Sequence, residues 1–230
     1  MKNYITLEIK LICRSKRIKQ FMILTTYFLF FIYYQLFIQG TLFIHSFFLK
    51  TILPMVIALP GMVLSQFFFG IEANYISKTM TVPVTFRHIL IQKYQLYCLM
   101  SLGMFLLLLP TLFWGVKITE LLVSLLLAMG FYLFLGFWSS VLSDKRLDLD
   151  ARGFANWQGN TIKQYILPNL LLIFASLILY CSTLFFSEEI ILWGMSVIGL
   201  IFIASSRIWL SSLANYYDKR KHDRIEKLDV

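Results

Sequence analysis

Three aspartates and two arginines share one short polar segment, and these residue types could hold a metal ion and a phosphate. Asp144, Asp148 and Asp150 stand beside Arg146 and Arg152. Carboxylate oxygens are ligands for divalent cations, and guanidinium groups bind phosphate oxygens in a bidentate manner. Residues 144–152 are therefore a candidate site for metal-assisted chemistry on a phosphorylated substrate.

The same segment has a partial likeness to an enzyme family. Asp150-Ala151-Arg152 resembles the end of the Asp-Gly-x-x-Ala-Arg core of membrane CDP-alcohol phosphotransferases. That chemistry requires several carboxylates over two helical turns and a base further along the chain, whereas the glycine and the downstream aspartates are missing here. Interleaved opposite charges are also typical of a solvated loop, so Asp148, Asp150 and Arg152 are alternatively a docking surface.

Nucleotide, zinc and disulfide chemistry find no support in the sequence. A P-loop requires GxxxxGK[ST], but the nearest run, residues 153–161, is one residue too long and has Asn160 where lysine is needed. Cys13, Cys98 and Cys181 are scattered, without a CxxC motif or a nearby histidine. We therefore predict no catalytic residues, no metal and no ATPase activity in this chain.

The composition places the chain in a lipid bilayer. Its 230 residues are 59% hydrophobic and 14% charged, and the mean hydropathy is +0.74. A soluble domain has about 45–50% apolar and about 25% charged residues, so this composition cannot form a water-solvated surface. Soluble enzymes and secreted disulfide scaffolds are thereby excluded.

Six apolar runs are long enough to cross about 30 Å of hydrocarbon as helices. None alternates with the period of two that a barrel strand requires. The predicted fold is all-α, with six transmembrane helices in a domain spanning residues 21–210. The runs are residues 21–38, 49–70, 94–114, 121–142, 165–186 and 190–210.

The positive charge indicates the orientation of these spans. With the N-terminus inside, all but two of the 21 lysines and arginines lie on the cytosolic side, the exceptions being Lys50 and Lys117. The positive-inside rule then predicts that both termini are cytosolic. The net charge of +9 therefore reflects topology and attraction to anionic membrane lipid, and no nucleic-acid partner is expected.

Two terminal segments flank the predicted spans. Residues 1–20 carry Ile5, Ile9 and Ile12 at helical spacing, with basic residues elsewhere, which is typical of an amphipathic helix lying at the membrane interface. A simple basic anchor is the alternative. Residues 211–230 are expected to form a basic cytosolic tail.

The cytosolic loop of residues 71–93 is too polar to cross the membrane and too regular for a slack connection. Proline disfavours a helical conformation at the preceding residue, so Pro83 separates two helical patterns. Thr85 is a suitable N-cap for a second helix that runs into the third span. We expect a helix-turn-helix with an exposed apolar patch suited to docking. The apolar positions are Tyr75, Ile76, Met80, Phe86, Ile89 and Leu90.

These elements resemble the membrane subunits of type-2 ATP-binding-cassette (ABC-2) exporters. Gly70-Ile71-Glu72 supplies the acidic residue that leaves span two, and Pro83-Val84-Thr85 matches the family's turn. Arg87-His88-Ile89-Leu90 with Lys93 matches its apolar and basic helix. The interfacial entry helix and the six spans with both ends inside add to the likeness. Between spans five and six, Ser187-Glu188-Glu189 leaves little room for the family's re-entrant helices.

The resemblance implies a permease subunit that couples a separate cytosolic ATPase to the export of an unidentified substrate. ATP and Mg²⁺ are then bound by the ATPase, and this chain needs no cofactor. A second copy or a paralogous permease completes the pathway, in a bacterial inner membrane. The coupling residues that the resemblance implies are Glu72, Tyr75, Met80, Pro83, Phe86, Arg87, Leu90 and Lys93.

Proline and glycine within the spans have two interpretations. Pro54, Pro60 and Gly61 predict a bent second span, which is either a hinge of a transport pathway or the ordinary use of these residues in membrane helices. Gly130 and Gly136 predict close packing of span four, including packing across a homodimer axis. An integral membrane enzyme of lipid metabolism using residues 144–152 and a non-catalytic membrane assembly subunit stay open as alternatives to the permease.

Overall fold

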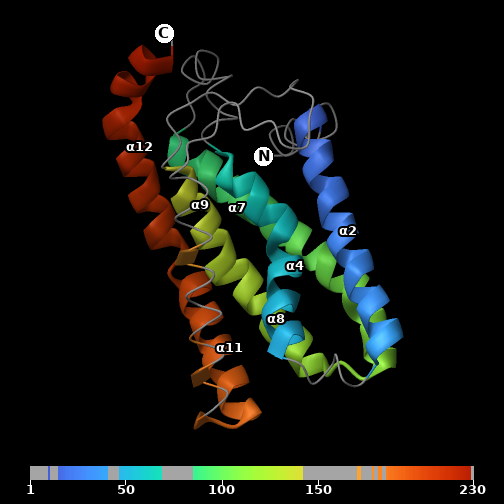
Figure 1. Ribbon diagram of the computed structural model, residues 1–230. Helices are drawn as coiled ribbons and strands as arrows, with labels where there is room; N and C mark the ends of the chain where they lie inside the picture. Colours follow the sequence, from blue (N-terminus) through green and yellow to red (C-terminus); the bar gives the residue numbers. More distant parts are fainter. Residues whose placement is uncertain are drawn as a thin grey trace.

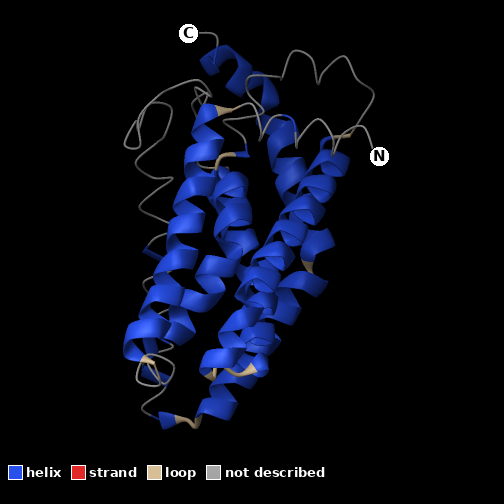
Figure 2. Ribbon diagram, turned by 90° about the vertical axis from the view of Figure 1, so that its right-hand side faces the viewer, coloured by secondary structure: helices blue, strands red, loops and turns tan. Residues whose placement is uncertain are grey.

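The computed structural model describes residues 10, 15–40, 47–68, 85–141, 170–171, 178, 181–182 and 185–228. Every element within this part of the chain is a helix (Figure 2). The elements, in order, are α2 (Lys16–Gln39), α4 (Phe47–Gln66), α7 (Phe86–Leu108), the 3-10 helix η1 (Leu109–Trp114), α8 (Ile118–Leu127), the π-helix η2 (Ala128–Tyr132), α9 (Leu133–Ser140), α11 (Glu188–Ala204) and α12 (Ser206–Leu228).

Three of the described helical stretches are long and apolar enough to cross a membrane. They are Ile18–Ile38, Phe86–Trp114 and Ile118–Ser140, with mean hydropathies of 1.8, 2.1 and 2.2. The pair Glu188–Ala204 and Ser206–Lys219, bent by 53°, makes a fourth if it is one span. Lys50–Gln66 is apolar but shorter. The all-helical class is confirmed for the described residues, and the three or four long apolar helices are compatible with a membrane protein. Six spans stay a prediction, and most of the expected span of residues 165–186 lies outside the described residues.

The termini of the long helices differ from the expected segment boundaries. Ser15 caps α2, because its Oγ accepts a hydrogen bond from the Ile18 amide at 3.3 Å. The helix then continues through Gln20, so residues 16–20 of the predicted arm belong to the first long helix. At the other end of the chain α12 crosses residue 210 without a break. Residues 16–20 of the expected arm and residues 211–228 of the expected tail therefore belong to helices of the bundle.

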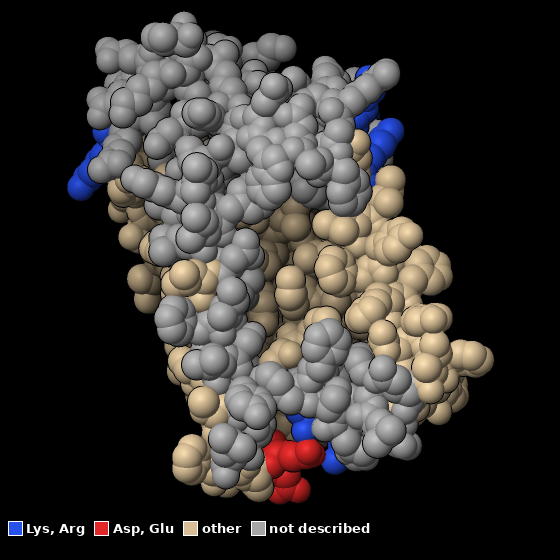
Figure 3. Space-filling model, in the orientation of Figure 1, with Lys and Arg blue, Asp and Glu red and all other residues tan. Residues whose placement is uncertain are grey.

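The bundle has two distinct ends (Figure 1). We call the end where α2 begins and α12 ends the terminal end, and the end where α2 ends and α11 begins the loop end. On the face shown in Figure 3, acidic side chains gather at the loop end, and the middle of the bundle carries no described charge. A charge-free belt between two polar ends is the surface that a bilayer requires.

Helix α4 lies at the centre and packs against α2, α7, α8, η2 and α9. A helix that is apolar on all sides is normally buried, and α4 follows this rule. Pro54 and Pro60 both lie inside it and are buried. At Gly61 a Cβ atom would lie 2.9 Å from Leu133 Cδ2 and 3.1 Å from the Tyr97 carbonyl oxygen. The absence of a side chain at Gly61 therefore lets α7 and α9 approach α4 closely.

The predicted small-residue packing of the fourth span is confirmed, with partners in the same chain. A Cβ at Gly136 would lie 2.9 Å from the Met62 carbonyl oxygen of α4. At Gly199 of α11 a Cβ would lie 2.8 Å from the Leu126 carbonyl oxygen. A Cβ at Gly130 of η2 would in turn overlap the Gly199 carbonyl oxygen. Small residues allow close backbone approach in membrane bundles. These glycines therefore hold α9 against α4 and η2 against α11.

Most buried hydroxyl groups are satisfied by their own helices. Ser65, Ser139 and Ser140 each donate to the carbonyl oxygen three residues earlier, at 2.8, 2.7 and 2.6 Å. Ser101 on α7 is different, because its buried Oγ has no hydrogen-bond partner within the described structure. An unsatisfied buried hydroxyl costs free energy.

Candidate functional site

Of the predicted coupling loop, residues 71–93, the structure describes only residues 85–93, at the start of α7. Thr85 is in the N-cap position with an extended backbone, and one helix runs from Phe86 to Leu108, as expected. Its cap is made by the main chain, since the His88 amide donates to the Thr85 carbonyl oxygen at 2.9 Å. The predicted coupling residues Glu72, Tyr75, Met80 and Pro83 lie outside the described residues.

The four described coupling residues have very different environments. Leu90 and Lys93 are fully buried, at 0% and 1% exposure, and Phe86 is half-buried. Arg87 is exposed. The expected exposed apolar patch is therefore wrong for Phe86 and Leu90. The reason is that α12 continues past the predicted membrane boundary and covers this face of α7.

Aromatic stacking fixes α12 on α7. The rings of Phe86 and Tyr217 are stacked, with centroids 3.9 Å apart and an interplanar angle of 12°. Phe68, which follows α4, packs against Phe86 at 5.6 Å. Lys93 Nζ lies 4.7 Å from the centroid of the Phe68 ring, in a cation–π contact. The first two turns of α7 are thus attached both to α12 and to the end of α4.

The bend between α11 and α12 is a feature that the sequence analysis missed. The Ser205 hydroxyl donates to the Ile201 carbonyl oxygen at 2.7 Å. Beyond the break, Trp209 Nε1 donates to the Phe202 carbonyl oxygen at 3.0 Å. Trp209 is 9% exposed and meets the ring of Tyr94 edge-on at 5.5 Å. The bend is therefore held by a specific side chain. The dipeptide Ser205-Ser206, inside an apolar run, was its only sequence signal.

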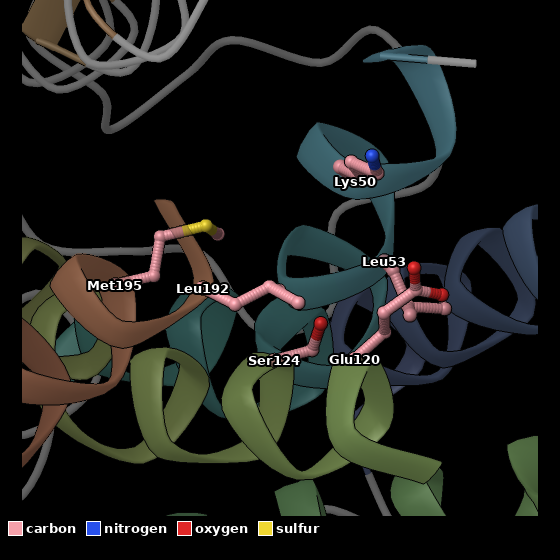
Figure 4. A pocket seen from close by; sticks show the side chains of 6 residues that line it. All are labelled: Lys50, Leu53, Glu120, Ser124, Leu192 and Met195. Carbon is pink, nitrogen blue, oxygen red and sulfur yellow. The ribbon is translucent and has the colours of Figure 1, made fainter. Parts of the chain in front are cut away.

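At the loop end, residues from three helices line one small pocket, and two of them are charged (Figure 4). Lys50 comes from α4, Glu120 and Ser124 come from α8, and α11 supplies Leu192 and Met195. Leu53 of α4 completes the lining. The pocket has a volume of about 10 Å³, which is room for about one water molecule. We call it the Glu120 pocket.

One lining residue of this pocket, Lys50, forms an ion pair with Glu188. Lys50 Nζ lies 2.6 Å from Glu188 Oε1, and the two side chains are 16% and 52% exposed. The pair joins the starts of α4 and α11. Glu120, in contrast, is 7% exposed. Its Oε2 accepts a hydrogen bond from the Lys117 amide at 3.4 Å, which caps the first turn of α8. The Lys117 to Glu120 spacing is the sequence signal that could have drawn attention to this carboxylate.

The remaining predicted sites have the following positions. Pro54, Pro60 and Gly61 are buried in α4, where Gly61 serves close packing. The possible second docking loop, with Asp148, Asp150 and Arg152, lies outside the described residues, as do residues 144–152 of the enzyme alternative. Within the part of the chain that the structure describes, no group of three or more His, Cys, Asp or Glu side chains could hold a metal ion.

Comparison with known proteins gives a family. Neither the comparison with curated proteins nor that with solved structures gave a significant match. One family of unknown function, DUF5687, matches residues 1–228, which is almost the whole chain. The chain therefore belongs to the DUF5687 family.

Proposed function

We propose that this chain is the membrane subunit of an ATP-driven exporter in a bacterial inner membrane. In this proposal a separate cytosolic ATPase docks on residues 71–93, of which the described part, residues 85–93, begins α7 at the terminal end. The six predicted spans and the one-sided distribution of basic residues support a multi-pass subunit with both termini in the cytosol.

The continuity of α7 is the observation that carries the proposal. This helix leads from the predicted docking loop to the loop end without a break, over 23 residues. At about 1.5 Å per residue it is about 35 Å long, which is enough to cross the hydrocarbon core. A displacement of the loop by a docked ATPase then moves the whole helix.

The burial of the first turns of α7 extends this argument to the neighbouring helices. Leu90 and Lys93 are embedded between the end of α4 and α12. Packed side chains have discrete arrangements, so a rigid helix transmits displacement to whatever it contacts. Motion of α7 therefore reaches α4, the central helix with its two prolines, and α12 beyond the bend.

The test is purification of the tagged chain from native membranes under gentle conditions, with identification of the proteins that accompany it. We expect an ABC ATPase in near-equal amounts. Arg87→Glu is the best variant of the docking region, because Arg87 is exposed and lies two residues beyond Thr85. A glutamate in the first turn also interacts favourably with the helix dipole, so folding is preserved. Lys19→Glu, at an exposed position of α2, makes the same charge change away from the loop.

The proposal predicts that Arg87→Glu lowers the recovered ATPase by about tenfold, the effect of 1.4 kcal/mol. Lys19→Glu leaves it within twofold of the unaltered protein. Absence of any ABC ATPase from the unaltered preparation refutes the proposal. Equal recovery with both variants refutes the docking role of residues 71–93.

A further inference from the structure

We propose that Tyr94 controls a hinge inside the bundle. Its hydroxyl holds the π-helix η2 against α7, and loss of this contact lets η2 and the end of α11, residues 199–204, open together. The Tyr94 hydroxyl donates a hydrogen bond to the Met129 carbonyl oxygen of η2 at 3.0 Å, and the residue is 9% exposed. This inference does not depend on export or on an ATPase.

The π-helix is an irregular segment within an apolar span. Between α8 and α9, the Leu133 amide donates to the Ala128 carbonyl oxygen, five residues earlier. Single π-turns inside α-helices are rare, and they are frequent at functional sites. The bilayer core has no water to replace a lost hydrogen bond, so a segment of this kind depends on donors from the protein. Tyr94 supplies one such donor to η2 from another helix.

The segments on both sides of η2 are fixed by contacts of their own. At the start of α8, the Lys117 amide donates to Glu120 Oε2 at 3.4 Å. In α9, Gly136 lies against the Met62 carbonyl oxygen and the side chain of Ser65, both on α4. Movement within this span is therefore easiest between the two fixed segments, where η2 lies.

The end of α11 must move with η2, because the two helices touch through their backbones. A Cβ at Gly130 would overlap the Gly199 carbonyl oxygen, so no side chain separates the helices at this point. One turn further along α11, the ring of Phe202 packs against Phe131 at 5.4 Å and against Phe134 at 4.8 Å between centroids. Such close packing transmits a displacement of η2 to α11.

The bend between α11 and α12 provides the pivot for this movement. The two helices meet at 53°, and α11 ends immediately before Ser205. Beyond the bend, the ring of Trp209 on α12 meets the Tyr94 ring edge-on at 5.5 Å. Tyr94 therefore contacts η2 on one side of the hinge and α12 on the other. Loss of its hydroxyl frees η2 and keeps the ring contact with α12.

The experiment is hydrogen exchange of the purified full chain in detergent micelles, followed by mass spectrometry of its peptides. Tyr94→Phe keeps the ring and removes the donor. We expect residues 129–134 to exchange about 3- to 20-fold faster, which corresponds to the 0.6–1.7 kcal/mol that such hydrogen bonds contribute in membrane bundles. Residues 199–204 should accelerate by the same factor, because they belong to the same opening unit. Exchange of α2 should change by less than about twofold.

Tyr33→Phe is the matched control. The Tyr33 hydroxyl also donates to a main-chain carbonyl oxygen of another helix, that of Leu107 on α7, but it has no such bond to η2. We expect this variant to leave the exchange of residues 129–134 and 199–204 within about twofold of the unaltered protein.

The unaltered protein gives a second measurement, which needs no variant. When closing is faster than exchange, the protection of an amide reports the free energy of the opening that exposes it. Residues 129–134 and 199–204 should therefore have equal protection, within about threefold, because one opening exposes both.

Four results overturn the inference. Unchanged exchange of residues 129–134 in Tyr94→Phe shows that the hydroxyl does not hold η2. Acceleration confined to these residues shows that α11 does not open with η2. Equal acceleration throughout the bundle, α2 included, shows a general loss of stability without a hinge. Unequal protection of the two segments in the unaltered protein shows that they open separately.

Discussion

Trp209 offers a direct test of how the bend between α11 and α12 is held. Its indole N–H donates to the Phe202 carbonyl oxygen, seven residues earlier, at 3.0 Å. Trp209→Phe keeps an aromatic ring against Tyr94 and Phe134, which lie 5.5 and 5.6 Å away between ring centroids, and removes the donor. The substitution therefore removes the hydrogen bond and one of the two fused rings, and it keeps the aromatic contacts.

The expected cost has two parts. Side-chain hydrogen bonds within membrane bundles contribute about 0.6 kcal/mol on average and up to about 1.7 kcal/mol. The Ser205 hydroxyl, 3.4 Å from the same carbonyl oxygen, replaces part of the lost bond. Loss of the second ring from a side chain that is 9% exposed adds about 1–2 kcal/mol through the space it leaves. The free energy of unfolding should fall by about 1.5–3 kcal/mol.

The assay is reversible unfolding in mixed micelles, followed by far-ultraviolet circular dichroism because the substitution removes a fluorophore. Trp193→Phe is the matched control, since Trp193 lies on α11 and is 73% exposed. We expect this control to change the free energy of unfolding by less than 0.5 kcal/mol, as is usual at the surface. If the two variants are equally stable, the bend does not depend on the indole, and the reasoning from this hydrogen bond is refuted.

Three further substitutions and one matched control test the packing. Gly136→Ala forces a methyl group into the side chain of Ser65 and should lower the free energy of unfolding by about 1–3 kcal/mol. The control Gly103→Ala, with open space around it, should raise the free energy of unfolding by about 0.5–1 kcal/mol. If Gly136→Ala melts at a higher temperature than Gly103→Ala, the contact with Ser65 is contradicted. Leu90→Ala should lower the free energy of unfolding by about 2–5 kcal/mol, because Leu90 is fully buried. If chemical denaturation shows no change in this free energy, Leu90 is exposed and this face of α7 is not covered by α12. Ser101→Ala should raise the free energy of unfolding by about 1 kcal/mol, since it removes a buried hydroxyl without a partner among the described residues. A lower melting temperature of this variant would show that the hydroxyl has a hydrogen-bond partner.

Local sequence patterns predicted where several helices begin and that the long helices are apolar. Apolar runs predicted the long helices, because in a bilayer each segment must satisfy its own backbone hydrogen bonds. Thr85 before an apolar run predicted the start of α7, and the glycines of the fourth span predicted close packing. These properties follow from short-range chemistry, which neighbouring residues determine.

The sequence pattern failed where an element continued beyond its apolar run. The polar residues after residue 210 predicted a basic cytosolic tail, yet Leu213, Ala214 and Tyr217 are buried. The few apolar residues of this stretch share one face, and that face covers the start of α7. A composition averaged over the segment hides such a face, so Leu90 was wrongly expected to be exposed.

By itself, the sequence determined that this chain is helical and apolar enough for a membrane, and where several of its helices begin. Only the tertiary structure decided which residues meet. Lys50 and Glu188 are 138 positions apart, and Glu120 reaches the same pocket from a third helix. No local pattern encodes that meeting, because it depends on how closely α4, α8 and α11 approach, and the contacts of Gly130 and Gly199 set part of that distance. The charges of the Glu120 pocket are thus a consequence of helix packing.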